Sequence, residues 1–505
     1  MSSVRKWVLG MLQPAAILVE LLVVCAAAWW TIAPADVWGQ TELTSANWFS
    51  AEVHENENSD GALDLYRPVD QYVLPSRSAN FGMLPASWNF ESKDIKPDGS
   101  DAPGEKKPEK PKEKTWFEKY SLRGYAQFRF NEVLREDPFG APAQSVGDRS
   151  IGDGKSYFIR RARIILAADI TENLYVYLQP DFAVAPPGSP DGTNFVQIRD
   201  WYGDIYLTTD KVHRLRAGSS KVPFGFENLQ SSSNRLPLDR SDSLNSAVRN
   251  ERDLGMFYYF TPAPVQDFFK SILDDGLKGS GNYGLFGIGT YAGQGGSLQE
   301  ANDRLHVVSR LTLPYTLASG QRMEMGVQGY FGDFVVLSSP ISPLGVGPAV
   351  RPLGALETGN SRGIYEDRIA ASFIWYPQPW GFQTEWNVGR GPALNPDHTE
   401  IVRRHLKGGY MLVQYQHKTC DHGIISPFYR YTFYEGGYKN ERNAPFVTIS
   451  EHDFGVEWQF GKGVELTVSY LITDRTNTQA ISVADELSYR QFDGDVLRFQ
   501  LQLNY

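Results

Sequence analysis

From Tyr120 onward the chain contains roughly sixteen short segments in which apolar and polar residues alternate. Successive side chains of a strand point to opposite faces, so each segment has one apolar and one polar surface. The clearest segments are 122–130, 158–168, 174–182, 305–313, 323–331, 369–375, 408–415, 428–434, 454–460 and 464–471. A propeller or sandwich would not show such strict two-sidedness, whereas a wall between lipid and water requires it. The pattern therefore predicts an all-β fold, a transmembrane antiparallel β-barrel of about 16 strands.

The last nine residues, 497–505, alternate without a break and end on an aromatic residue. One face would carry Leu497, Phe499, Leu501, Leu503 and Tyr505, and the other Arg498, Gln500, Gln502 and Asn504. An ordinary half-buried strand could look the same, but a C-terminal strand that closes on Phe or Tyr resembles the assembly signal of bacterial outer-membrane barrels. We therefore expect this strand to pair with segment 122–130 and to close the cylinder.

The connections between the predicted strands alternate in length. Short ones at 208–211, 419–423 and 461–463 interleave with long ones at about 131–155, 223–253, 334–364 and 474–493. Short periplasmic turns and long external loops produce this rhythm. One connection breaks the rule, because 262–281 should be a short turn but is long. It carries Phe268, Phe269, Ile272 and Leu273 at helical spacing.

The amino-terminal 35 residues read as a secretory signal peptide that is removed. Arg5 and Lys6 precede an apolar stretch, and small residues follow it at 26–28 and 33–35. A membrane anchor is the alternative, but a carboxylate at Glu20 would be costly in hydrocarbon. We therefore expect export to the outer membrane of a bacterial cell.

Residues 36–115 have a different composition from the rest, and they end in the charged, proline-rich run 101–114. Such a run cannot bury a core and predicts an extended periplasmic linker. Residues 116–505 would then form the barrel domain. Of the two cysteines, Cys25 would leave with the signal peptide, so strand pairing rather than disulfides must hold the fold.

Several arginines fall on the predicted inner face of the barrel. These candidate pore-lining, anion-binding residues are Arg123, Arg129, Arg161, Arg163, Arg310, Arg430 and Arg498. A ladder of lumenal arginines attracts and selects anions. The competing interpretation is that a water-filled barrel has a polar inner wall in any case, with Asp200, Tyr202, Asp204 and Tyr206 as partners for the arginines. The sequence leaves both interpretations open.

Catalytic, metal-binding and nucleotide-binding motifs find little support. The histidines show no paired ligand spacing, and His417, Cys420 and His422 fall in a predicted turn. The run Gly287-Ile288-Gly289 lacks the last glycine and the strand-to-helix context of a dinucleotide loop. We therefore expect a protein that is not an enzyme, without a metal site, a cofactor or a nucleic-acid partner.

A series of short motifs resembles the phosphate-selective porin O and P family. They are found, in order, at 158–163, 215–218, 221–227, 238–241, 252–255, 289–295, 408–410 and 430–431, and in the closing strand. The resemblance spans about 120–505 and rests on the order and spacing of motifs that are individually weak. It implies a homotrimer of sixteen-stranded barrels in outer-membrane lipid, each an independent pore, with a third loop that folds inward and sets the constriction.

The segment that matches this third loop runs from Phe224 to Arg252. Its constriction candidates are Arg235, Asp239, Arg240, Arg249 and Arg252, and Glu227, Asp242 and Glu251 bring its charges close to balance. Phosphate-selective members of the family use an arginine ladder together with lysines at the constriction. This segment has no lysine beyond Lys221 at its base, so phosphate specificity is left open.

The function expected from these patterns is passive diffusion of small hydrophilic solutes through a water-filled channel, with phosphate or other anions as possible substrates. The alternative is a structural or adhesive barrel that is plugged by its own loops and tethered through the N-terminal extension. Ionic conductance in a lipid bilayer would separate the two.

Overall fold

The computed structural model describes residues 119–135, 157–184, 195–296, 298–343, 347–419, 422–461, 463–477 and 490–505. All of them belong to one compact unit, residues 104–505. The predicted signal peptide at 1–35 and the whole of the predicted extension at 36–115 lie outside the described residues, and both remain predictions.

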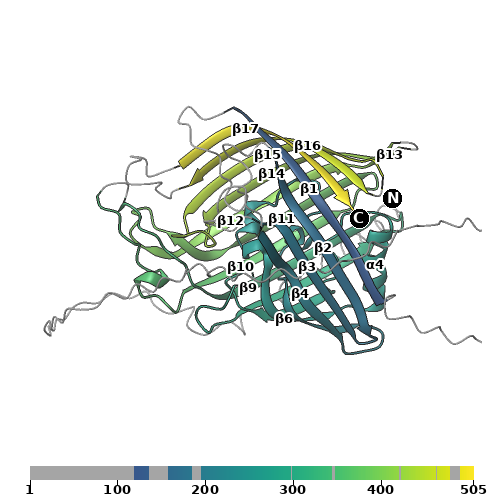
Figure 1. Ribbon diagram of the computed structural model, residues 1–505, viewed down its shortest axis with the longest axis horizontal. Helices are drawn as coiled ribbons and strands as arrows, with labels where there is room; N and C mark the ends of the chain where they lie inside the picture. The colour runs from purple at the N-terminus through teal and green to yellow at the C-terminus, as the bar shows by residue number, and fades with distance from the viewer. Residues whose placement is uncertain are drawn as a thin grey trace, which may run out of the picture. The chain divides into compact units, whose positions relative to one another are not determined.

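The strands form one antiparallel sheet that curls into a cylinder (Figure 1). The first half contains β1 (Tyr120–Arg135), β2 (Tyr157–Thr171), β3 (Leu174–Val184), β4 (Phe195–Tyr206), β5 (His213–Lys221), β6 (Arg252–Phe260), β7 (Phe286–Tyr291) and β8 (His306–Thr316). The second half contains β9 (Arg322–Phe334), β10 (Ile364–Trp375), β11 (Trp380–Leu394), β12 (Ile401–Tyr415), β13 (His417–Thr419), β14 (Gly423–Gly437), β15 (Phe446–Gln459), β16 (Val464–Asn477) and β17 (Arg490–Asn504).

The cylinder has sixteen staves and is closed. β12 and the three-residue β13 both pair with β14, so together they make one stave. β1 pairs with β2 on one side and with β17 on the other, which leaves the sheet without a free edge. The predicted all-β barrel of about 16 strands is confirmed, and so is the predicted pairing of the last strand with the first.

The helical segments are few and short. They are α2 (Phe226–Leu229), α3 (Asp242–Asn245), α4 (Ala263–Asp274), η3 (Arg249–Glu251) and η5 (Leu356–Thr358). In the part of the chain that the structure describes, no helix is long and apolar enough to cross a membrane.

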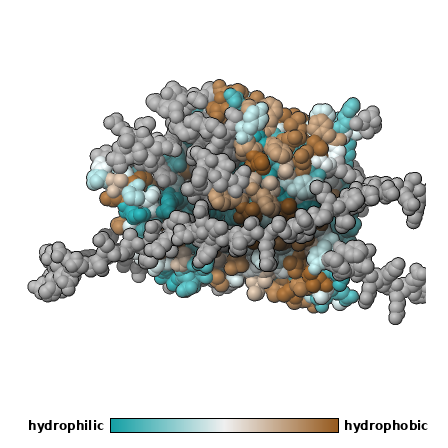
Figure 2. Space-filling view, viewed as in Figure 1, coloured by the Kyte–Doolittle hydropathy of each residue, from teal (hydrophilic) through white to brown (hydrophobic). Residues whose placement is uncertain are grey.

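The two faces of the closing strand are as predicted. Arg498, Gln500 and Gln502 are buried inside the barrel, whereas Leu501, Leu503 and Tyr505 are exposed on its outer surface. Exposed Leu, Ile, Phe and Trp side chains continue along the outer wall of other strands. Figure 2 shows apolar side chains gathered over the strands of one such face. A protein in water rarely exposes so much apolar surface, which fits a wall against lipid.

The connections alternate in length as predicted. At one end of the barrel the chain turns within a few residues, as at 172–173, 317–321 and 376–379. The end that carries the long loops is external by the usual rule for such barrels. The exception at the short-turn, periplasmic end is 261–285, which contains α4. Its Phe268, Phe269 and Ile272 are buried as helical spacing suggested, but Leu273 is exposed.

The seam between β1 and β17 depends on a glycine. A Cβ atom on Gly124 would lie 2.4 Å from the carbonyl oxygen of Arg163 and 2.5 Å from the ring of Tyr505. We expect Gly124→Ala to displace Tyr505. When samples are heated before gel electrophoresis, a smaller fraction of this variant than of the wild type should then run as folded barrel. Gly461→Ala is the matched control, because nothing lies within 4 Å of that added atom. Equal heat resistance of the two variants would contradict this role of the seam.

Candidate pore constriction

The connection between β5 and β6, residues 222–251, folds into the barrel, and we call it loop 3. Its contacts reach strands far apart in the chain. Ser232 Oγ lies 2.7 Å from the hydroxyl of Tyr125 on β1, and its carbonyl oxygen accepts a hydrogen bond from Gln127. The carbonyl oxygen of Ala247 accepts one from the hydroxyl of Tyr330 on β9. Loop 3 therefore crosses the lumen.

Apolar side chains hold one flank of loop 3 against the wall. Phe224, Leu244 and Val248 are buried in a cluster with residues of β6 to β10 and β12. The rings of Phe224 and Tyr330 meet edge to face at a centroid distance of 4.9 Å. Burial of each large apolar side chain contributes roughly 1.5–3 kcal/mol. Loop 3 therefore packs against this side of the barrel and leaves space on the other side.

The base of loop 3 is fixed by a buried carboxylate. Glu385 on β11 accepts hydrogen bonds from the backbone N–H groups of Phe226, at 2.6 Å, and Glu227, at 3.1 Å. The chain can approach this closely because Gly225 adopts a positive φ of 85°, and a Cβ there would lie 3.2 Å from a Glu385 oxygen. Glu385 thus satisfies two backbone donors that no helix or strand pairs.

A second anchor comes from β10. The Arg368 guanidinium donates to the carbonyl oxygen of Ser243 at 3.2 Å and to the hydroxyl of Ser246 at 2.9 Å. Asn387 on β11 donates to the same Ser243 carbonyl at 3.0 Å. Loop 3 is therefore positioned by hydrogen bonds as well as by apolar packing.

Ion pairs connect loop 3 to the opposite wall. Asp239 pairs with Arg129 on β1 at 3.0 Å and also with Arg498 on β17. Glu227 pairs with Arg430 on β14 at 2.9 Å. These pairs hold the loop across the lumen at a fixed position.

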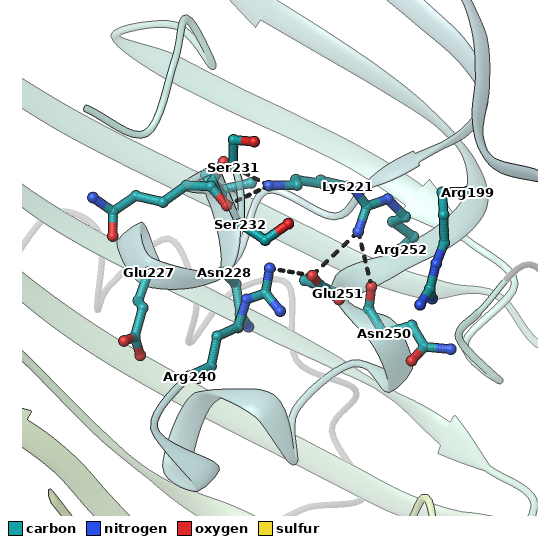
Figure 3. Close-up of polar contacts among 12 residues, drawn as sticks. Arg199, Lys221, Glu227, Asn228, Ser231, Ser232, Arg240, Asn250, Glu251 and Arg252 are labelled. Carbon is teal, nitrogen blue, oxygen red and sulfur yellow. Dashed lines mark hydrogen bonds and ion pairs between the residues drawn. The ribbon is translucent and has the colours of Figure 1, made fainter. Parts of the chain in front are cut away.

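At the end of loop 3, Glu251 lies between two arginines, Arg240 and Arg252 (Figure 3). Lys221, at the base of the loop, donates to the carbonyl oxygens of Leu229, at 2.9 Å, and Gln230, at 2.6 Å. Its ammonium group therefore supports the loop backbone and is not directed at the open lumen.

A polar cavity of about 110 Å³ lies between loop 3 and the wall formed by β2, β4 and β14 to β17. Nine arginines and four carboxylates line it: Arg160, Arg161, Arg163, Arg199, Arg235, Arg240, Arg430, Arg475, Arg498, Asp239, Asp242, Glu251 and Glu451. The formal charge of the lining is therefore positive. A cavity lined with excess positive charge raises the local concentration of anions.

Most of these arginines are already paired with a carboxylate. Arg163, for example, contacts Asp181 at 2.7 Å, and Arg475 contacts Asp242 at 2.9 Å. Two are not, because within the described residues neither Arg161 nor Arg235 has a carboxylate within 4 Å. Among the described residues, these two guanidinium groups therefore provide positive charge that no direct ion pair offsets.

Arg161 and Arg235 differ in their hydrogen bonds. Arg161 donates to the side-chain oxygen of Gln127 at 2.7 Å. Arg235 is only 6% exposed, and all three of its guanidinium nitrogens are buried without a hydrogen-bond partner in the described part of the chain. Burial lowers the pKa of Arg235, and the negative charges of Glu227 and Asp239 oppose that change. An arginine with such donors is a strong candidate to bind an anion.

The cavity brings together seven of the twelve residues predicted from the sequence: Arg161, Arg163, Arg430, Arg498, Arg235, Asp239 and Arg240. The other five do not line it: Arg123, Arg129, Arg249, Arg252 and Arg310. The inward direction predicted for Arg129 and Arg310 is nevertheless correct, because both are buried inside the barrel. The anion-binding role of all twelve residues stays a prediction.

The five residues outside the cavity have other surroundings. Arg129 pairs with Asp239 at 3.0 Å, Arg252 pairs with Asp200 at 2.8 Å, and Arg310 donates a hydrogen bond to Gln328 at 3.2 Å. Arg249 is partly buried in η3, and Arg123 is exposed near the periplasmic end of β1.

Sequence alternation did not identify three arginines of the cavity. Arg160 and Arg199 sit at β-bulges, where pairing skips one residue on β2 and one on β4. A bulge turns the extra side chain away from strict alternation, so both arginines reach the lumen. Arg475 falls in what was predicted as an external loop, because β16 extends to Asn477. The doublet Arg160-Arg161 was the available signal of a bulge, since two adjacent charges cannot alternate.

A closed barrel with an apolar outer wall, a polar interior and an inward-folded loop has the architecture of a porin. The family model described as phosphate-selective porin O and P matches residues 143–505, and the chain belongs to this family. It is therefore an outer-membrane porin, a channel for small solutes. Its fold and family are those of a channel rather than of an enzyme.

Several solved structures are similar to this chain at low sequence identity. OmpT, an outer membrane protein of Vibrio cholerae, is 8% identical, with 76% of this chain and 97% of that chain covered and a TM-score of 0.44. The outer membrane channel DcaP of Acinetobacter baumannii is 13% identical, with coverages of 76% and 97% and a TM-score of 0.43. OprB of Pseudomonas putida is 9% identical, with coverages of 77% and 94% and a TM-score of 0.43. No curated protein matches the sequence.

Proposed function

We propose that this porin passes small anions in preference to cations, and that oxyanions of the phosphate type are its favoured solutes. The observation that carries the proposal is the pair Arg161 and Arg235, which line the cavity beside loop 3 without a carboxylate partner in the described structure. A guanidinium group presents a planar fork of donors that matches two oxygens of a phosphate.

The carboxylates of the same cavity suit passage rather than tight capture. Asp239, Asp242, Glu251 and Glu451 offset part of the arginine charge. A conducting site has to attract its ion and yet release it, so partial neutralisation favours flux. Loop 3 contributes no lysine, so the positively charged donors for an anion here are arginines.

Inorganic phosphate in a chloride-filled channel tests the proposal. In a planar bilayer we expect phosphate to reduce the chloride current in a saturable manner, because both anions compete for the same arginines. A chloride current that phosphate does not reduce would contradict a phosphate-type site. Absence of any conductance would instead favour the alternative, a structural or adhesive barrel plugged by its loops.

We also propose that the channel is a homotrimer, as the family resemblance implies. Each barrel contains its own loop 3 and its own arginine-lined cavity, so each subunit would conduct independently. Single-channel records should then show three equal current steps per inserted complex. Records with only single steps would contradict the trimer.

A further inference from the structure

The connection from β6 to β7, residues 261–285, turns into the barrel beneath loop 3, and we call it the crossing segment. Its helix α4 buries Phe268, Phe269 and Ile272 against Phe226 of loop 3 and Tyr376, which follows β10. Pro262 precedes the helix and favours its start. Figure 1 shows α4 at the end of the barrel where β17 ends. The helix is thus an internal element of the periplasmic mouth.

After α4 the chain crosses to the opposite wall. The ammonium group of Lys278 lies 2.9 Å from a Glu457 oxygen on β15 and 3.9 Å from a Glu465 oxygen on β16. In the order of strands round the barrel, β15 is the eighth stave after β6, which is halfway round sixteen. The crossing segment starts at one wall and binds the other, so it spans the width of the lumen.

The crossing segment also supports loop 3 from below. Gln230 donates a hydrogen bond to the carbonyl oxygen of Lys278 at 2.8 Å, and Asn234 donates one to that of Gly279 at 3.1 Å. The chain then returns to its own wall, where Arg214 on β5 donates to the carbonyl oxygen of Asn282 at 2.6 Å. Two layers of chain, loop 3 and the crossing segment, therefore lie one below the other across the pore.

The contact at the far wall is electrostatically favourable. Lys278 is mostly buried, and burial alone would lower its pKa, but Glu457 and Glu465 outweigh this effect and raise the pKa. The lysine is therefore charged at neutral pH and holds two carboxylates of adjacent strands. Lys278 therefore links the crossing segment to two adjacent strands of the far wall.

We propose that the crossing segment is a second, periplasmic constriction that determines the size limit of the channel, and that Lys278 is the specificity-determining residue that closes it against Glu457 and Glu465. Solutes that pass loop 3 must also pass beside this segment. The constriction acts on size, so it limits neutral solutes as well as anions. It is independent of the anion preference proposed above.

The most direct test replaces residues 262–280 with a short turn, since β6 and β7 are neighbours and can be joined closely. We expect single-channel conductance to rise about twofold or more, because a layer across the lumen is removed. In proteoliposome swelling assays, neutral sugars too large for the wild-type channel should enter. An unchanged conductance and an unchanged sugar limit would overturn the proposal.

A smaller change keeps the test valid if the shortened barrel does not fold. The double variant Lys278→Gln with Glu457→Gln keeps the crossing segment but removes its ionic contact with the far wall, and we expect larger sugars to enter faster. The control is Lys270→Gln with Asp274→Asn, which makes the same change of charge in an exposed pair of α4 and should alter nothing. Equal sugar entry in the two double variants would overturn the role of Lys278.

The reversal potential of each variant separates this inference from the anion proposal. If the size limit rises while the anion preference persists, both stand. A wild-type channel without anion preference would contradict the anion proposal alone, because the sugar measurements use uncharged solutes.

Discussion

Replacing Arg161 and Arg235 together by glutamine is expected to weaken the preference of the channel for anions about tenfold. These two guanidinium groups line the cavity without a carboxylate partner in the described structure. An anion about 4 Å from such a group gains roughly 4 kcal/mol at an effective dielectric constant of about 20, before screening by salt. A tenfold change needs only about 1.4 kcal/mol, so the effect should remain after screening.

The control for this double variant is Arg304→Gln with Arg362→Gln. Both arginines lie near Asp333 at the external end of the barrel, they are largely exposed, and neither lines the cavity. Exposed charges are screened by salt, so the control should keep the wild-type permeability ratio. If both variants shift the ratio equally, the effect is one of net charge and not of the cavity.

Replacing Glu385 by alanine is expected to destabilise loop 3 more than any single change in its cavity. The variant leaves the backbone N–H groups of Phe226 and Glu227 buried without an acceptor. Each unsatisfied group costs about 1–3 kcal/mol. We expect a lower unfolding temperature of the barrel in detergent and larger fluctuations of the open-channel current.

Glu435→Ala serves as the comparison, because Glu435 is partly exposed on the outside of the barrel and its ion pair among the described residues is with Lys407, at 3.1 Å. Surface changes of this kind usually alter stability by less than about 0.5 kcal/mol. If the two alanine variants unfolded at the same temperature and conducted with the same current noise, Glu385 would not be what holds the base of loop 3.

The barrel itself could be predicted from the sequence because the pattern that indicates each strand lies within that strand. Alternation of period two needs only the residues of one strand, and the closing strand 497–505 shows it completely. Alternation fails where a bulge inserts a residue, and so it did not place Arg160 and Arg199 in the lumen.

The position of loop 3 depends on contacts that no local pattern encodes. Glu385 and Arg368 are more than a hundred residues away from the loop backbone that they bind. Only two signals were available: the family resemblance, and the apolar residues Phe224, Leu244 and Val248 in a stretch that an external loop would keep polar. The helical spacing within 262–281 predicted a helix, but not that the chain crosses the pore after it.

We propose above all that a positively charged cavity beside loop 3 makes this porin selective for anions. The purified protein in a planar bilayer under a potassium chloride gradient tests it most directly, because the sign of the reversal potential reports which ion permeates more easily. We expect a reversal potential of the sign set by chloride. A reversal potential of the sign set by potassium would contradict it.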